Sequence, residues 1–297
     1  MKVNPDTGGS TARWRLTYRC WRISRVRTQL AISCLLGILL TLPALSDTRE
    51  MDVSAGVVGG AGYLAGSSAK PPVLILHGFL QTRNFAAVSR MTEGLGELDY
   101  TVLTPTLSLG ITRRRQSESC EALHLHELDD DVAELALWVE WLHRESGQAI
   151  VIIAHSAAAH TVTRFINDHP EAPVGRLIFI SPSYLKGHPL GPEPPQRGAI
   201  AVYALGFCPH YATTPKAFRS YVDWSPEKML DTLERWRERV SVIIGTGDER
   251  LSPHWIQALR DKAIDISNVE GANHFFASSH EFDLLEKVEH HLKVQSR

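Results

Sequence analysis

The sequence lacks an excess of basic residues, and it lacks a long apolar run. Its 297 residues hold 31 Lys and Arg against 33 Asp and Glu. A nucleic-acid-binding domain usually carries a clear positive excess, so this balance argues against that function class. The clearest apolar run, residues 30–42, falls short of the roughly 20 residues that span a bilayer. We therefore expect no nucleic-acid partner and no stable membrane span in the mature chain.

The short apolar run belongs to a pattern at the N-terminus. Seven Lys and Arg precede it, and Ala44-Leu45-Ser46 follows it with small residues at the two positions that a signal peptidase reads. Basic, apolar and small-residue regions in this order are typical of a secretory signal. The pattern predicts a signal peptide over residues 1–46, cleavage near Ser46, and export to the periplasm or the medium. A membrane anchor that stays uncleaved is the alternative.

Cysteine is also scarce, with four residues in the whole chain. Two of them, Cys120 and Cys208, remain after the signal peptide. In the oxidising compartment that export implies, an even pair favours a disulfide. Two buried free thiols are the alternative, and neither cysteine lies in a motif that suggests catalysis.

The exported part is large and acidic. Residues 1–46 hold seven basic residues and one acidic residue, so 24 basic and 32 acidic residues remain, a net charge of −8. Short apolar runs predict strands near residues 73–76, 100–104, 149–153, 177–181, 240–244 and 264–269. Helical patterns occupy 84–98, 127–144, 157–167, 254–263 and 280–293, and a weak strand or a hairpin is expected within 53–64. This alternation is typical of one α/β domain with a mostly parallel central sheet and helices on both faces.

Glycine is absent where a sharp strand-to-helix turn would need small residues. The β-branched run that ends at Ile153 leads into Ala154-His155-Ser156-Ala157-Ala158. A serine on such a turn has its hydroxyl lifted above the sheet edge, and the usual pattern is G-x-S-x-G. Here alanine stands at both glycine positions, and the stretch resembles the nucleophile elbow of the α/β-hydrolase family. The alternative is that Ser156 only caps the following helix.

Three further segments carry the same resemblance, in the order that the family uses. The strand at 73–76 runs into His77-Gly78-Phe79, which is similar to the first oxyanion loop. The resemblance implies that the backbone N–H groups of Phe79 and Ala157 form an oxyanion hole. It also implies that Asp248, in Gly245-Thr246-Gly247-Asp248 after a late strand, is the catalytic acid. His274, just past the last strand, is then the catalytic base.

The assignment of the acid leaves alternatives open. Glu249 and Asp223 are other candidates, and Asp248 has a purely local explanation as an Asx-turn residue. The sequence holds 14 histidines, so His274 stands out by its position after the last strand and not by its residue type.

Residues 105–126 form a loop that is long for a compact domain, which is typical of a functional loop. We interpret its run Arg113-Arg114-Arg115 as a solvated face, with an anchor for an acidic substrate group as the alternative. His124 and His126 suggest a metal site, but the sequence places no third ligand, so no metal is predicted. Asp129, Asp130 and Asp131, just beyond the loop, are interpreted as residues that favour a helix start.

Residues 183–235, approximately, interrupt the alternation with a segment rich in proline, glycine and aromatic residues. The resemblance implies a lid at this place, with an apolar acyl pocket shaped by the aromatic side chains. The alternative is that these side chains form the segment's own small core. They are Tyr203, Phe207, Tyr211, Phe218, Tyr221 and Trp224.

Taken together, the resemblance implies a serine hydrolase that cleaves an ester of a small-molecule acyl substrate through Ser156, His274 and Asp248. It implies an acyl-serine intermediate and no cofactor. Lipases, amidases and thioesterases on the same triad are alternatives, as is a non-catalytic binding protein that has kept the fold. The sequence does not indicate the oligomeric state.

Overall fold

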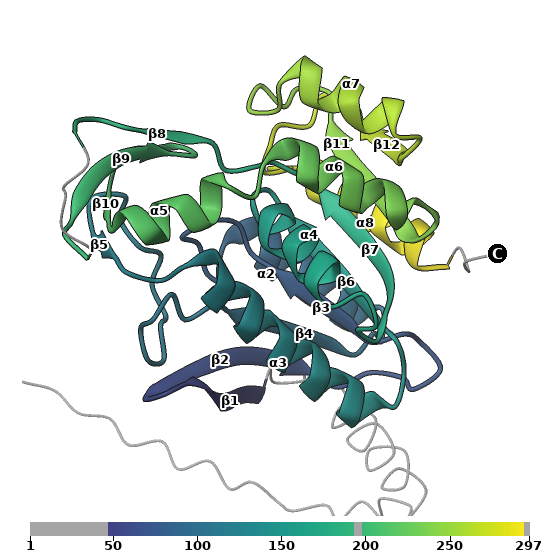
Figure 1. Ribbon diagram of the computed structural model, residues 1–297. Coiled ribbons are helices and arrows are strands. Elements are labelled where there is room, and N and C mark those ends of the chain that lie inside the picture. Colours follow the sequence, from purple (N-terminus) through teal and green to yellow (C-terminus); the bar gives the residue numbers. More distant parts are fainter. Residues whose placement is uncertain (1–46, 193–197, 294–297) are drawn as a thin grey trace, which may run out of the picture. The chain divides into compact units, whose positions relative to one another are not determined.

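The computed structural model of the protein describes residues 47–192 and 198–293 (Figure 1). The predicted signal peptide, residues 1–46, lies outside the described residues. Within the described part, no helix combines the length and the apolar character that crossing a membrane requires.

A sheet of eight strands forms the centre of the described domain, in the order β1-β2-β4-β3-β6-β7-β11-β12. β1 and β2 form the expected hairpin, which starts earlier than predicted, and β2 pairs with β4 in the antiparallel direction. All other neighbours are parallel. The strands are β1 (Asp47–Ser54), β2 (Val57–Leu64), β3 (Val73–Leu76), β4 (Val102–Thr106), β6 (Ile150–His155), β7 (Val174–Ile180), β11 (Val240–Gly245) and β12 (Asp265–Val269).

The central strands are apolar on both faces because each face carries its own core. In β3, Leu74 and Leu76 belong to one core, while Val73 and Ile75 belong to the other. This alternation follows from the two-residue period of a strand. The first core is covered by α3 (Leu128–Ser146), α4 (Ala158–Asp168), α6 (Pro226–Arg235) and α7 (Pro253–Asp261). The second is covered by α2 (Ala86–Glu97) and α8 (His280–Lys293), so helices lie on both faces as predicted.

The segment between β7 and β11 builds a second, smaller sheet of four strands, in the order β5-β10-β9-β8. Three strands come from this segment: β8 (Gly187–Pro189), β9 (Ala201–Leu205) and β10 (Cys208–Thr213). The fourth, β5 (Leu123–His124), comes from the long loop after β4, which is therefore not entirely irregular. At the left of Figure 1 these strands lie beside α5 (Pro215–Val222). The insertion and the long loop thus share one sheet.

Most aromatic side chains of the insertion form its own core. Tyr203, Tyr211, Phe218 and Tyr221 are buried, and the rings of Tyr203 and Phe218 stack 3.9 Å apart. Phe207 differs, because 56% of its surface is exposed. The prediction of an aromatic acyl pocket is thus too broad, since a small sheet has to bury its inner face before its side chains can line a pocket.

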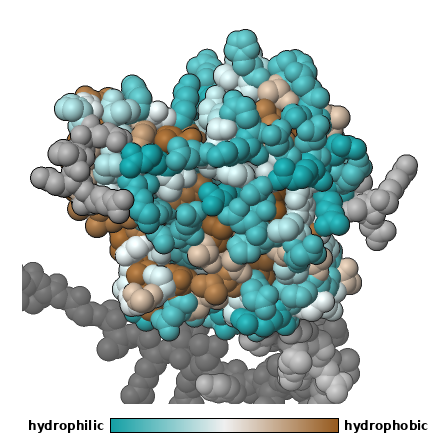
Figure 2. All heavy atoms as spheres, viewed as in Figure 1, coloured by the Kyte–Doolittle hydropathy of each residue, from teal (hydrophilic) through white to brown (hydrophobic). Residues whose placement is uncertain are grey.

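The outer side of this region is partly apolar. In Figure 2, apolar side chains gather on the left, over the area where Figure 1 draws β5, β9 and β10. The exposed apolar residues of these strands include Leu123 and Val202, and Leu125, just after β5, is exposed as well.

The interpretation of the arginine run as a solvated face is wrong for Arg114. Its guanidinium is buried and donates to the carbonyl oxygens of Leu107 and Gln116, both at 2.8 Å, and of Gln81 at 2.6 Å. Burial lowers the pKa of Arg114 to about 10. The side chain therefore fixes the long loop to the loop that follows β3. Arg113 remains at the surface, where it pairs with Glu50.

The structure confirms that the three aspartates lie at the start of a helix, but Asp131 has a second role. Asp131 lies in the first turn of α3 but is buried, and it accepts a hydrogen bond of 2.6 Å from the Tyr221 hydroxyl. Burial raises its pKa to about 8. The reason is that α5, which carries Tyr221, covers this end of α3, and no pattern in the sequence indicates that contact.

Candidate active site

Ser156 lies on the turn between β6 and α4. Its φ angle of +56° is in the left-handed region, which non-glycine residues adopt at a cost in energy. Its N–H donates to the Ile180 carbonyl at 2.9 Å, and its own carbonyl accepts from Ser183 N–H at 3.2 Å. These backbone bonds fix the turn from both sides, so the hydroxyl is held above the end of the sheet.

The two alanines in place of glycine fit because the turn needs small side chains there and not positive φ angles. Ala154 and Ala158 are almost fully buried, and neither has a positive φ. Gly78 packs against the turn, since a Cβ atom added to it would lie 3.4 Å from the Ser156 Cβ. The sharp turn thus tolerates methyl groups at its ends.

Ser156, His274 and Asp248 lie in one chain of hydrogen bonds. The distance from Ser156 Oγ to His274 Nε2 is 2.7 Å, and the distance from His274 Nδ1 to Asp248 Oδ2 is 2.8 Å. Asp248 follows β11, and His274 follows β12 after the positive-φ residue Gly271. Three segments far apart in the sequence meet here because parallel strands bring their carboxyl ends to one edge of a sheet.

The ionisation of Asp248 fixes the tautomer of His274. Burial of the Asp248 carboxyl is the largest single influence on its pKa and raises it. The hydrogen bonds from His274, Ser181 and the Arg250 N–H, together with the charge interaction with His274, outweigh burial and leave the pKa below its ordinary value. The carboxyl is therefore a carboxylate at neutral pH and only accepts hydrogen bonds. His274 Nδ1 must then carry a hydrogen, and Nε2 is free to accept the proton of the Ser156 hydroxyl.

Asp248 also has the local role that the sequence offered as an alternative, that of an Asx-turn residue. Its Oδ1 accepts the Arg250 N–H at 2.9 Å, while Oδ2 contacts His274. The other two candidate acids lie elsewhere: Glu249 is exposed, and Asp223 caps the end of α5. Of the three, the structure brings Asp248 to His274.

Phe79 and Ala157 flank Ser156 at the same cavity. Phe79 follows His77 and Gly78 at the end of β3, and Ala157 directly follows the serine. In the described part of the chain, neither backbone N–H donates a hydrogen bond to a protein acceptor. Both N–H groups are thus free for an oxygen atom of a bound molecule.

His77 holds the loop that carries Phe79. Its Nδ1 donates to the Gly78 carbonyl at 2.8 Å, and its Nε2 accepts the Leu107 N–H at 3.0 Å. Burial lowers its pKa to about 3, so the ring is neutral, as this pair of bonds requires. The residue therefore has a positioning role.

His155, next to the serine, holds the loop that carries His274. Its Nε2 donates to the His274 carbonyl at 3.1 Å. Burial lowers its pKa to about 4, so the ring stays neutral. No motif in the sequence indicates this role, and the position of His155 beside Ser156 is the one signal that could have singled it out.

A cavity of about 500 Å³ opens over Ser156 and His274. Phe79, Phe207 and Trp255 give it apolar walls, and Ser183 lies at its floor with its Oγ 3.4 Å from the Ser156 Oγ. A volume of this size is typical of a small-molecule site.

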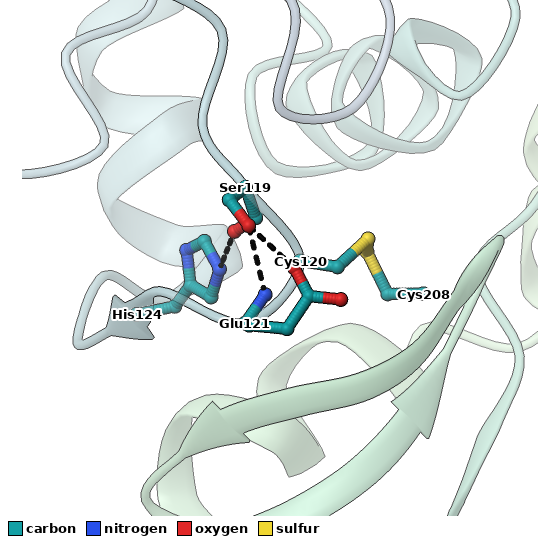
Figure 3. The surroundings of a disulfide bond; sticks show 5 residues. All are labelled: Ser119, Cys120, Glu121, His124 and Cys208. Atoms are coloured by element: carbon teal, nitrogen blue, oxygen red, sulfur yellow. Dashed lines mark hydrogen bonds between the residues drawn. A yellow bond between two sulfur atoms is a disulfide. The ribbon is translucent and has the colours of Figure 1, made fainter.

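The Cys120–Cys208 disulfide connects the long loop to the start of β10 (Figure 3). Near it, the His124 ring contacts the Ser119 carbonyl at 3.0 Å. Cys208 directly follows Phe207, which lines the cavity over Ser156. The disulfide therefore fixes the tip of the β9–β10 hairpin at the edge of the cavity.

His124 and His126 lie together but away from Ser156. Their rings are 5.9 Å apart, and the His124 ring stacks on Tyr211 at 4.2 Å. Among residues 47–192 and 198–293, no group of three or more His, Cys, Asp and Glu side chains is arranged to hold a metal ion.

Comparison with models of known families identifies one family. The sequence model of the alpha/beta hydrolase family matches residues 73–287. No curated protein matches the sequence significantly.

Solved structures resemble the chain in fold. Est1E from Butyrivibrio proteoclasticus is 15% identical, with a TM-score of 0.61, and the match covers 82% of this chain and 97% of that one. A serine hydrolase without a lid from Xanthomonas campestris is 15% identical, with a TM-score of 0.54, over 85% and 95% of the two chains. The thioesterase domain of the curacin biosynthetic pathway is 12% identical, with a TM-score of 0.56, over 82% and 99%. At these identities the likeness extends to the fold alone.

Proposed function

This chain belongs to the alpha/beta hydrolase family, and we propose that it is a serine hydrolase that cleaves carboxylic esters of small molecules. The observation that carries the proposal is the continuous hydrogen-bond chain from Ser156 through His274 to Asp248, at 2.7 Å and 2.8 Å. A serine hydroxyl is a weak nucleophile at neutral pH, and a base within hydrogen-bond reach activates it.

In the first half of the reaction, Ser156 Oγ attacks the ester carbonyl carbon and its proton moves to His274 Nε2. Asp248 stabilises the imidazolium that forms. The tetrahedral intermediate collapses as the C–O bond to the alcohol breaks, and His274 returns the proton to the departing oxygen. The acyl group then remains on Ser156.

In the second half, a water molecule attacks the acyl-serine and gives a proton to His274. The bond to Ser156 Oγ breaks, the carboxylic acid leaves, and the proton returns to the serine. In both halves the negative carbonyl oxygen is bound by the backbone N–H groups of Phe79 and Ala157. One donor of this kind is worth on the order of 10²–10³ in rate.

We assign the insertion, at about residues 183–235, the role of a lid. Supporting this, Phe207 at the tip of the β9–β10 hairpin lines the cavity, and its ring centre lies 6.1 Å from the ring centre of Phe79. We further propose that the protein is exported after cleavage near Ser46, on the basis of the N-terminal pattern and the Cys120–Cys208 disulfide, which an oxidising compartment maintains.

Labelling with a fluorophosphonate, read by intact mass and peptide mapping, tests the proposal. We expect a single adduct on Ser156 in the wild type, and none in Ser156→Ala or His274→Ala. His169→Ala is the matched control, because His169 ends α4 away from the cavity and should leave the labelling intact.

A folded wild-type protein without an adduct would contradict the proposal and favour a binding protein. If the adduct forms, comparing esters, amides and thioesters over several acyl lengths separates an esterase from a lipase, an amidase or a thioesterase.

A further inference from the structure

The cavity over Ser156 carries fixed charges of one sign. Among the described residues that line it, Lys186 and Arg250 carry fixed charges, and no carboxylate lines it. The chain beyond residue 46 has a net charge of −8. Although acidic residues outnumber basic ones in this part of the chain, the charges that line the cavity are both positive.

Both cations are available to a ligand. Lys186 and Arg250 are exposed, and within the described part of the chain neither forms an ion pair with a carboxylate. The Arg250 guanidinium lies 4.7 Å from the centre of the Phe275 ring, and Phe275 itself lines the cavity next to His274. This cation–π contact keeps Arg250 beside the reacting groups and leaves its N–H donors open.

A helix end adds to the positive potential. α7 begins at the cavity, where Ser252 caps it by accepting the Trp255 N–H at 3.2 Å. The Trp255 indole donates to the Pro182 carbonyl at 2.8 Å and so fixes this helix end against the loop after β7. The start of a helix carries a partial positive charge. Lys186, Arg250 and the start of α7 thus surround one cavity with positive potential.

We propose that the substrate is an ester that also carries a carboxylate group, and that Lys186 and Arg250 bind this group while Ser156 attacks the ester carbonyl. The inference rests on the proposed serine hydrolase function and adds the substrate class. Guanidinium and ammonium groups form charge-assisted hydrogen bonds with carboxylates. Since both cations are exposed, salt screens their attraction, and the preference for the anion depends on ionic strength.

Two matched pairs of esters test the proposal, because the carboxylate can belong to either half of the substrate. In the acyl pair, the para-nitrophenyl monoester of adipic acid is compared with para-nitrophenyl hexanoate, which has an acyl chain of equal length. In the alcohol pair, para-acetoxybenzoate is compared with para-acetoxybenzamide. The readout is the ratio of kcat/KM for the anionic ester to kcat/KM for the neutral one. The ratio of each variant is then divided by the ratio of the wild type, so that the intrinsic reactivities of the two esters cancel.

In at least one pair, we expect Lys186→Gln and Arg250→Gln each to lower this ratio by about tenfold. Arg260→Gln is the control, since it removes an exposed cation from the far end of α7 and should leave the ratio unchanged. The wild-type ratio should also fall when NaCl rises from about 0.02 M to about 0.5 M.

The outcomes separate the two proposals. If fluorophosphonate labels Ser156 but neither variant changes the ratio in either pair, the carboxylate-binding role is overturned and the serine hydrolase function stands. If Ser156 does not label and no ester is cleaved, both proposals fail. If the anionic-to-neutral ratio falls in the control Arg260→Gln too, the carboxylate-binding role is also overturned. That result would indicate a long-range charge effect and not a binding site.

Discussion

Two buried aspartates of this protein have opposite ionisation. The side chain of Asp248 has no exposed surface, and it accepts a hydrogen bond from His274 at 2.8 Å. Asp131 is also buried, and it accepts one from the Tyr221 hydroxyl at 2.6 Å. The pKa of Asp248 lies below its ordinary value, whereas burial raises the pKa of Asp131 to about 8. At neutral pH the first is a carboxylate and the second is protonated.

The difference comes from the partners and from the surroundings, because Asp131 lies deeper in the protein than Asp248. A histidine ring can take up a positive charge beside a carboxylate, and a tyrosine hydroxyl cannot. Glu134 and Asp130 lie near Asp131 and raise its pKa further, because they are like charges. The nearby cation Arg114 donates its hydrogen bonds to backbone carbonyls. Burial therefore prepares a carboxylate for catalysis only where a chargeable partner is buried with it.

The largest expected effect comes from removing the charge of Asp248. Asn has the same size, but its amide NH2 can donate a hydrogen bond to His274 Nδ1. The ring then carries its hydrogen on Nε2, which can no longer accept the Ser156 proton. We expect kcat for ester hydrolysis in Asp248→Asn to fall by about 10⁴. Steady-state kinetics measure this, with circular dichroism as the check that the variant is folded. A loss of less than about tenfold would contradict the assigned role of Asp248.

The disulfide should have the next largest effect, on stability. It closes a segment between residues 88 apart in the sequence. The chain-entropy model gives about 4.6 kcal/mol for a loop of that length. We expect the double variant Cys120→Ser, Cys208→Ser to lose stability of this order in urea unfolding.

The same double variant sharpens the comparison of the two aspartates. The insertion that contains β10 also carries Tyr221, which donates to Asp131, while Ser156, His274 and Asp248 lie at the ends of the large sheet. The kcat of the folded variant should thus stay close to the wild-type value. Unchanged stability, or a loss of kcat, would contradict the view that the disulfide stabilises the insertion and leaves the catalytic residues in place.

The smallest expected effect is the pH dependence that Asp131 contributes to stability. Between its ordinary pKa near 3.8 and its native value of about 8, the unfolded chain is ionised while the native state keeps the proton. Raising the pH over this range therefore favours unfolding. We expect Asp131→Asn, which stays uncharged, to reduce the loss of unfolding free energy between pH 4 and pH 8, by up to a few kcal/mol.

Asp129→Asn is the control for Asp131→Asn. It lies in the same turn of α3 but is exposed and pairs with Arg164 at the surface. Its pH profile of stability should match the wild type. Equal slopes in all three proteins would show that Asp131 is ionised in the native state.

Much of the architecture could be predicted from the sequence because its signals are local. The apolar runs that became β3, β6, β7 and β11 have a composition typical of buried strands. The turn at Ser156 needs small neighbours, and Ala154 and Ala158 provide them. The resemblance also selected Asp248 and His274 by their places after late strands, and the structure brings both side chains to Ser156.

Other features could not be predicted, because they depend on contacts between distant segments. The three residues Arg113, Arg114 and Arg115 have identical chemistry in the sequence, yet the fold buries only the middle one among carbonyl groups. Likewise Lys186 lies near the start of the insertion and Arg250 lies after its end, yet both line one cavity.

The sequence by itself determined the strand and helix pattern, the family and the order of the candidate catalytic residues, since these follow from side-chain period and local motifs. Only the tertiary structure decided which charges are buried, which partners they have and which of them face the cavity. The physical reason is that the free energy of a charge depends on everything within a few ångströms of it, and those neighbours come from anywhere in the chain.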